Sequence, residues 1–197
     1  MSHGKGLSAD EALLKLQQGN EKYLNASANP GDVSPAIRKD TCENGQHPYA
    51  TVITCSDSRV IPESIFSAGI GELFTIRVAG NVVNNFEIGS VEYAADHLGT
   101  NLVVVLGHTN CGAVGAAMSG PGEGFIKSIT DEIQAAIGDE KDGYKASCLN
   151  VRNSIAKIEK SLHIPAGQDK DGLKVVGAPT VSKETSGARP LSSVTSS

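Results

Sequence analysis

The sequence predicts an α/β fold: a single domain with a mainly parallel β-sheet flanked by helices, and an N-terminal helical arm. First, short apolar segments typical of buried strands alternate with segments whose apolar residues recur at helical spacing. Second, Asn101–Leu106 is apolar on both faces, as expected of a central parallel strand. Third, no internal repeat or linker divides the 197 residues, of which 39% are hydrophobic, enough to form one core.

Each expected strand is a short apolar run next to turn residues. The strands are Tyr49–Thr54, Leu73–Val78, Asn101–Leu106 and Leu173–Ala178. Each expected helix has apolar residues at three-to-four spacing or a clear start or stop signal. The helices are Ser8–Leu24, Pro62–Ser67, Glu87–Leu98, Gly112–Met118, Phe125–Ile137 and a segment from Cys148 to Leu162. The first helix begins with a capping-box pattern, Ser8 followed by Glu11.

The remaining segments define the expected organisation of the chain. Residues Asn25–Gln46 are rich in Asn, Pro, Gly and Ser, which is typical of an arm or loop. From Pro179 onward the chain is rich in Ser and Thr without an apolar period, so we expect it to be loosely ordered. We therefore expect a helical arm over 1–46, an α/β domain over 47–178 that carries the chemistry, and a tail over 179–197.

Composition excludes several classes of protein. The chain has 17 basic and 22 acidic residues, a net charge of −5, and 4% aromatic residues. This composition lacks the basic footprint that nucleic-acid binding needs. No apolar run reaches the roughly 20 residues that span a bilayer. Because Met1–Asp10 is polar and has no apolar signal-peptide core, we expect a soluble, cytoplasmic protein.

The chain has four cysteines, Cys42, Cys55, Cys111 and Cys148. Four cysteines in a chain of this length, without an export signal, do not indicate a disulfide scaffold. The alternatives are a metal ligand, a nucleophile or a small buried apolar residue. Cys148 matches the apolar face of its helix and Cys42 lies in the polar arm, so neither is expected to bind a metal.

Two short motifs carry the chemistry. Cys55-Ser-Asp-Ser-Arg59 follows the first strand, and His108-Thr-Asn-Cys111 follows the central strand. Ligands of α/β proteins bind at the carboxyl ends of parallel strands, so the two motifs can meet there. Two thiolates and one imidazole suit zinc, and three protein ligands leave an open position, as in catalytic sites. We therefore expect a zinc ion on Cys55, His108 and Cys111.

Each motif residue also has a simpler interpretation when taken alone. Cys55 and Cys111 are then buried thiols, and His108 is a histidine bonded to backbone at a strand end. Asp57 is then a helix cap before Pro62, and Arg59 belongs to a surface ion pair. These interpretations weaken when both motifs fall at strand ends of one sheet.

The sequence resembles the β-class carbonic anhydrases, of the bacterial and plant type, from Ser8 to Ala178. The resemblance rests on CSDSRV (55–60), GELFTIRVAGNVV (71–83), SVEYAADHLG (90–99) and VVVLGHTNCGAV (103–114), in that order and spacing. It implies zinc on the three ligands, an Asp57–Arg59 pair, and a homodimer or higher even-numbered homo-oligomer. It also implies reversible hydration of carbon dioxide to bicarbonate and a proton.

A mechanism follows from these roles. Zinc acidifies its bound water and supplies hydroxide near neutral pH. Arg59 holds Asp57 ionised, so that the carboxylate only accepts a hydrogen bond and orients the hydroxide. The N–H of Gly112, at the start of a helix beside the metal, suits charge that develops on the substrate oxygens.

The resemblance further implies a substrate pocket. Gln46, nine residues before Cys55, matches a pocket glutamine of plant-type members. Phe74 and Tyr93 match pocket aromatic residues that those members take from the neighbouring subunit. Without the resemblance, Gln46 is a loop residue, and Phe74 and Tyr93 belong to the core.

Two positions separate this chain from parts of the family. One subgroup binds bicarbonate at a regulatory site and has a Trp three residues before the first Cys ligand. Val52 stands there and the chain has no Trp, which favours an open site with water as fourth ligand. Arg77 matches both this subgroup and plant-type members and does not discriminate. Pro179 cannot donate to a sheet ladder, so we expect a shortened last strand.

Two other functions compete with this interpretation. The first is hydrolysis of carbonyl sulfide or carbon disulfide at the same zinc site. The second is a non-catalytic, zinc-stabilised protein, which would have a fourth Cys or His on the metal. A dinucleotide-binding enzyme is disfavoured because no Gly-rich fingerprint follows the first strand.

Overall fold

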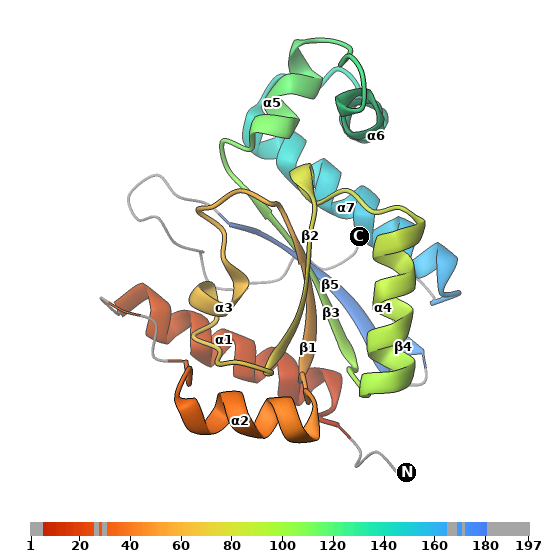
Figure 1. Ribbon diagram of the computed structural model, residues 1–197. Coiled ribbons are helices and arrows are strands. Elements are labelled where there is room, and N and C mark those ends of the chain that lie inside the picture. The colour runs from red at the N-terminus through yellow and green to blue at the C-terminus, as the bar shows by residue number, and fades with distance from the viewer. Residues whose placement is uncertain (1–5, 26–27, 29–30, 165–168, 171, 181–197) are drawn as a thin grey trace.

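The computed structural model describes residues 6–25, 28, 31–164, 169–170 and 172–180. Its centre is a five-stranded sheet in the order β2-β1-β3-β5-β4 (Figure 1). The strands are β1 (Ala50–Thr54), β2 (Leu73–Arg77), β3 (Leu102–His108), β4 (Asp169–Lys170) and β5 (Leu173–Thr180). The pairs β1–β2, β1–β3 and β3–β5 are parallel, and only β4 pairs antiparallel. The predicted α/β class and four expected strands are therefore confirmed.

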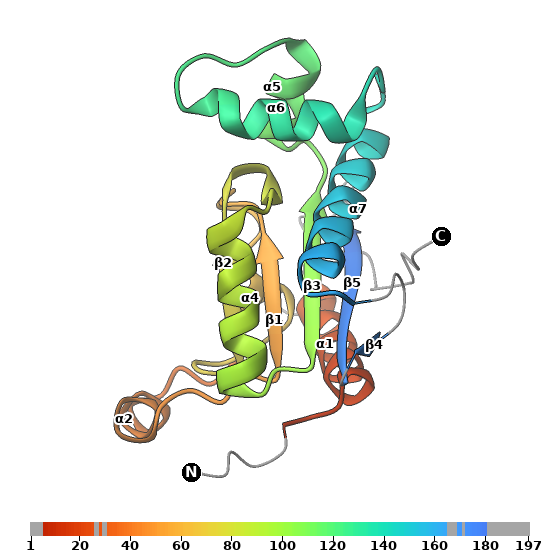
Figure 2. The same cartoon turned by 90° about the vertical axis from the view of Figure 1, so that its right-hand side faces the viewer.

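The helices follow the strands and cover both faces of the sheet. They are α1 (Ala9–Asn25), α2 (Pro35–Asn44), α3 (Pro62–Ile65), α4 (Asn85–Leu98), α5 (Gly112–Ser119), α6 (Ile126–Ile137) and α7 (Gly143–Ser161). A short 3₁₀ turn, η1 (Ala79–Asn81), joins β2 to α4. Figure 2 shows α4 and α7 on one face of the sheet and α1 on the other. The sheet thus forms the middle layer of a single domain.

Alternation along the buried strands divides the core into two halves. Every residue of β1 and β3 is buried, as expected of the central strands of a parallel sheet. Val104 faces the cluster that includes Leu16 of α1. Its neighbour Val105 faces the cluster that includes Val91 of α4 and Val151 of α7. Because side chains alternate with period two, one strand supplies both halves of the core.

The start of the chain agrees with the capping-box prediction. The backbone N–H of Ser8 donates to Glu11 Oε2 at 2.8 Å, and the Glu11 N–H donates to Ser8 Oγ at 3.3 Å. These reciprocal bonds satisfy donors that the first turn of α1 leaves free. Among the described residues, no helix is long and apolar enough to cross a bilayer.

Two expectations about irregular segments differ from the structure. The segment 25–46, expected as an arm or loop, contains helix α2, which Ser34 caps through an N–H bond from Ile37 at 3.3 Å. The last strand, expected to be shortened at Pro179, continues to Thr180, with Pro179 in register with Gly107. The tail from 181 onward lies outside the described residues.

Candidate metal and catalytic site

The three predicted metal ligands meet at the carboxyl edge of the sheet. Cys55 follows β1, His108 ends β3, and Cys111 caps the start of α5. Since β1 and β3 are parallel neighbours, with Thr54 opposite Leu106, both motifs leave the sheet at the same edge. One ligand atom from each residue lies within 4.8 Å of the others, and all three residues are buried. This is the one such group of metal-ligating side chains among the described residues.

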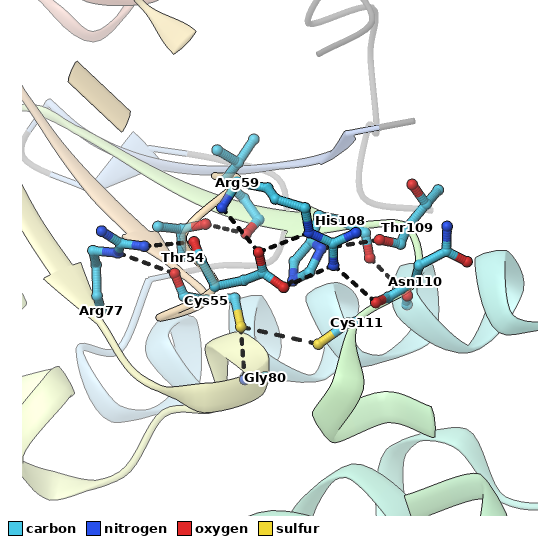
Figure 3. A network of polar contacts seen from close by, with 12 residues as sticks. Thr54, Cys55, Arg59, Arg77, Gly80, His108, Thr109, Asn110 and Cys111 are labelled. Carbon is cyan, nitrogen blue, oxygen red and sulfur yellow. Dashed lines mark hydrogen bonds and ion pairs between the residues drawn. The ribbon is translucent and has the colours of Figure 1, made fainter. Parts of the chain in front are cut away.

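The two thiols form a coupled pair. Cys55 Sγ lies 4.0 Å from Cys111 Sγ (Figure 3). The hydrogen bond between the two sulfurs lowers the pKa of the Cys55 thiol and raises that of the Cys111 thiol. The N–H of Gly80 donates to Cys55 Sγ at 3.3 Å and adds to this stabilisation of the thiolate. One thiolate and one thiol are therefore favoured before metal binding, and a metal ion would release the remaining proton.

His108 is oriented to offer one nitrogen to a metal. Its Nδ1 lies 3.0 Å from the carbonyl of Thr109 and can donate to it. Its Nε2 is buried and has no hydrogen-bond partner among the described residues. Burying an unpaired polar atom is costly, and a metal ion would satisfy it. The orphaned Nε2 beside two thiols therefore fits a zinc ion, the group expected from the sequence.

Asp57 and Arg59 form the expected ion pair over this group. Arg59 Nε donates to Asp57 Oδ1 at 2.9 Å and Nη2 donates to Oδ2 at 2.8 Å. Arg59 Nη2 also donates to the Asn110 carbonyl at 3.1 Å, which ties the two motifs together (Figure 3). The Arg59 guanidinium holds the pKa of the Asp57 carboxyl well below its usual range. Asp57 Oδ2 lies 3.9 Å from His108 Nε2, so an ionised carboxylate faces the candidate metal position.

Arg77 has a role that sequence reasoning missed. It ends β2 opposite Thr54 of β1, and its guanidinium points toward the Cys55 motif (Figure 3). Arg77 Nε donates to the Cys55 carbonyl at 3.1 Å and Nη2 donates to the Asp57 carbonyl at 2.7 Å. The backbone on both sides of Ser56 is therefore held by one side chain. The sequence signals were the position of Arg77 near a strand end and its match to an arginine of the family, and neither indicates which carbonyls the side chain binds.

The predicted substrate residues divide into two groups. Gly112 begins α5 next to Cys111 and lies at the site. Gln46 is exposed and precedes β1, whereas Cys55 follows it. Phe74 pairs in register with Thr51 near the start of β1 and contacts Tyr93, with 6.1 Å between ring centroids. Within one chain, these three residues thus lie toward the opposite end of the strands from the metal ligands.

The other two cysteines stand apart from this group. Cys42 is exposed on α2 and Cys148 is half-buried on α7. Neither joins the ligand group, and burial raises the pKa of the Cys148 thiol, which favours the protonated form. The described residues therefore offer three ligands and not the four of a structural zinc site.

Comparisons with known proteins agree with this geometry. A family model described as carbonic anhydrase matches residues 50–185, more than half of the chain. Carbonic anhydrase 2 of Mycobacterium tuberculosis is 36% identical over 133 residues, and the carbonic anhydrase of Mycolicibacterium smegmatis is 38% identical over 132. Each alignment covers 64% of this chain and 63% of the relative, so the match spans less than two thirds of those proteins.

A solved structure shows the same fold. The β-carbonic anhydrase of Coccomyxa, in complex with acetazolamide, superposes with a TM-score of 0.60 at 28% identity. The superposition covers 76% of this chain and 82% of the Coccomyxa chain. The central sheet and its flanking helices are therefore shared with that protein.

Proposed function

Because the chain belongs to the β-carbonic anhydrase family, we propose that it catalyses the zinc-dependent, reversible hydration of carbon dioxide to bicarbonate and a proton. The observation that carries the proposal is the ligand group Cys55, His108 and Cys111, with the Asp57 carboxylate beside it. Three ligands leave a coordination position for a reactant. A fourth Cys or His is absent from the group among the described residues, which argues against a purely structural zinc site.

The chain's own residues then position the reactants. A bound zinc ion would act as a Lewis acid that supplies hydroxide near neutral pH. The Asp57 carboxylate, kept ionised by Arg59, can accept a hydrogen bond but cannot donate one. It therefore fixes the direction of the proton on a nucleophile beside it, and such orientation can contribute several kcal/mol to lowering a barrier. Arg77 keeps the Asp57 backbone in place through a hydrogen bond to its carbonyl.

Substrate contacts complete the proposal. The backbone N–H groups at the start of α5 face the ligand group, and those of Ala113 and Val114 already bond to Cys111. Gly112, in the same turn, is proposed to bind the substrate oxygens as they gain negative charge. Gln46, Phe74 and Tyr93 are proposed to line the pocket of a neighbouring subunit in a homodimer or a larger even-numbered assembly. The cytoplasmic location stays a prediction, which cell fractionation tests.

Metal content and carbon dioxide hydration, measured on the same purified protein, test the proposal. We expect about one zinc ion per chain and hydration that a chelator abolishes and added zinc restores. Parallel assays with carbonyl sulfide and carbon disulfide separate the competing hydrolase function. Zinc-loaded protein that is inactive on all three substrates would instead indicate a non-catalytic, zinc-stabilised protein.

A further inference from the structure

The turn η1 touches the metal site in an unusual conformation. Its N–H at Gly80 donates to Cys55 Sγ at 3.3 Å. Gly80 has φ 71° and Asn81 has φ 46°, so two consecutive residues are left-handed. This conformation is strained for most side chains and persists only where surrounding structure holds it. A Cβ at Gly80 would also lie 2.7 Å from Ile133 Cδ1, so that side chain would have to shift, but the positive φ is the stronger reason for glycine at this position.

Two side chains of helix α7 hold the turn η1 through hydrogen bonds to its carbonyls. Asn150 Nδ2 donates to the Gly80 carbonyl at 2.6 Å, and Ser154 Oγ donates to the Asn81 carbonyl at 3.0 Å. Asn150 and Ser154 lie four residues apart, so they project from the same face of the helix. Both residues are 1% exposed. The turn is therefore clamped at two successive carbonyls by buried donors.

A third donor extends this polar stripe. Ser147 Oγ, one helical turn before Asn150, lies 3.2 Å from the carbonyl of His108 and 2.9 Å from that of Gly143, and its single proton can be donated to either. The stripe Ser147, Asn150 and Ser154 lies beside apolar residues of α7 that pack against the sheet, among them Val151 and Ile155. Burying a polar side chain costs free energy unless it is hydrogen-bonded. Packing alone would therefore favour apolar residues at these three positions. All three donors reach carbonyls of segments that form or touch the metal site.

We propose that Asn150 is a positioning residue that aims the Gly80 N–H at Cys55 and so sets the metal affinity of the site. The inference rests on the proposed zinc site. A hydrogen bond from Asn150 fixes the Gly80 peptide on its carbonyl side, while the N–H on the other side of Gly80 fixes the Cys55 sulfur. A thiolate held in place by an N–H donor is preorganised for metal binding. Residues that orient ligands in this way typically change metal affinity by about 10–100-fold when removed.

The test compares two asparagines of α7. Asn150→Leu removes the donor to Gly80 and keeps a side chain of similar size. Asn153→Leu is the matched control, because Asn153 Nδ2 donates to Glu132 Oε1 at 2.8 Å, on the side of α7 that faces α6. For both variants and the unchanged protein, zinc affinity is measured by competition with a chromophoric chelator. The cobalt(II) forms are compared by the sulfur-to-metal charge-transfer band, a readout that needs no substrate.

We expect Asn150→Leu to weaken zinc binding by about 10–100-fold and to move the cobalt band to longer wavelength, because an N–H bond stabilises the sulfur lone pairs. The Asn153→Leu protein should match the unchanged protein in both measurements. If Asn150→Leu does not fold, Asn150→Ser replaces it, since a serine hydroxyl is too short to reach Gly80. A folded Asn150 variant with unchanged affinity and band would overturn the inference. If the unchanged protein itself binds no zinc, the proposed function is wrong instead.

Discussion

At the scale of single residues, the site is held by side chains that act on backbone. Arg77 binds the carbonyls of Cys55 and Asp57, and Arg59 binds the Asn110 carbonyl in addition to the Asp57 carboxylate. Thiolates and carboxylates repel one another at close range, so a site that gathers them requires fixed positive charge and donors. The two arginines supply this charge at the edge of the sheet, where the ligand-bearing loops have no strand to hold them.

The ligand assignment predicts the effect of replacing each cysteine. Cys55→Ser or Cys111→Ser should abolish zinc binding and hydration together, because only three ligands are present among the described residues. Cys42→Ser and Cys148→Ser are the controls, since one is exposed and the other lies outside the group. Zinc content and hydration rate are measured for all four variants. Full zinc occupancy in Cys55→Ser would refute the assignment, and zinc loss in Cys148→Ser would indicate a fourth ligand.

Arg59 is predicted to affect chemistry more than metal binding. Arg59→Ala leaves the three ligands intact but removes the two-pronged hold on Asp57, so zinc content should persist. Hydration should slow on the order of 100-fold, the cost typical of misplacing a reacting group. Arg38→Ala, on the exposed surface of α2, provides the control and should keep the normal rate. An unchanged rate in Arg59→Ala would remove the ion pair from the mechanism.

The residues that bear the site's chemistry could be predicted from the sequence, whereas those that hold its backbone could not. Cys55, His108, Cys111, Asp57 and Arg59 could be singled out because their side chains have chemistry that apolar packing does not need. Arg77 and Asn150 act on backbone carbonyls, and a sequence does not show which carbonyl a side chain will reach. The apolar spacing that predicts the helix of Asn150 explains its neighbours as core residues and gives no role to Asn150 itself.

At the scale of elements, strong periodicity predicted most helices and strands, and local chemistry explains the exceptions. Helix α2 has no buried residues, so no apolar stripe marks it. Its signal was Ser34 as N-cap followed by Pro35 at the first helical position. Strand β5 tolerates Pro179 because β4 pairs only with Lys174 and Leu173. On the side of β5 away from β3, no described strand pairs with Pro179, and an unpaired strand edge is where a sheet tolerates proline.

The docking of α1 predicts a pH-dependent contribution to stability. Lys15 of α1 donates to Glu72 Oε1 at 2.7 Å, and the Gly69 N–H donates to Glu72 Oε2 at 2.7 Å. Burial raises the pKa of the Glu72 carboxyl, but these two partners outweigh it, so the pKa lies below its ordinary value. A lowered folded-state pKa means that ionised Glu72 stabilises the fold above the unfolded-state pKa of about 4.3. That contribution is lost as pH falls through the lower, folded-state pKa.

Glu72→Gln should therefore reduce the free energy of unfolding at neutral pH, and the difference from the unchanged protein should vanish in acid. Urea unfolding at a series of pH values from neutral to below the folded-state pKa measures this difference. Glu43→Gln is the control, because Glu43 pairs only loosely with Lys39, at 3.9 Å on exposed α2. A difference for Glu72→Gln that stays constant across the series would show that ionisation of Glu72 does not stabilise the docking of α1.

At the scale of the whole molecule, the sheet has two chemically different ends. Its carboxyl edge gathers the candidate metal ligands, and its other end carries Gln46, Phe74 and Tyr93. The five residues of β1, about 16 Å long at roughly 3.3 Å per residue, lie between Gln46 and Cys55 in the chain. Tyr93 is 48% exposed, although its ring makes tilted contacts with the rings of Phe74 and His97. In the proposed homo-oligomer, this half-exposed ring would face the site of a second copy.

Mixing an inactive variant with an impaired one tests whether sites are shared between subunits. Cys55→Ser lacks a metal site but keeps Tyr93, and Tyr93→Ala keeps the metal site but lacks the aromatic residue. We expect Tyr93→Ala alone to retain zinc and to hydrate carbon dioxide about 10-fold or more slowly, because a pocket contact is lost. In a mixed dimer, the intact Cys55 of one chain would meet the intact Tyr93 of the other. Hydration should then rise above the sum of the separately assayed variants.

Recovery of hydration on mixing distinguishes two arrangements: Tyr93 serves either the metal site of its own chain or that of the neighbouring chain. If Tyr93 serves the site of its own chain, every mixed dimer combines two defective sites, and mixing restores nothing. The two chains are unfolded and refolded together with zinc so that subunits exchange, and analytical ultracentrifugation establishes the molar mass. A mixture of Cys55→Ser with Cys111→Ser is the control, since neither chain can form a metal site. A monomeric molar mass, or no recovery in a confirmed mixed assembly, would exclude a pocket shared between subunits.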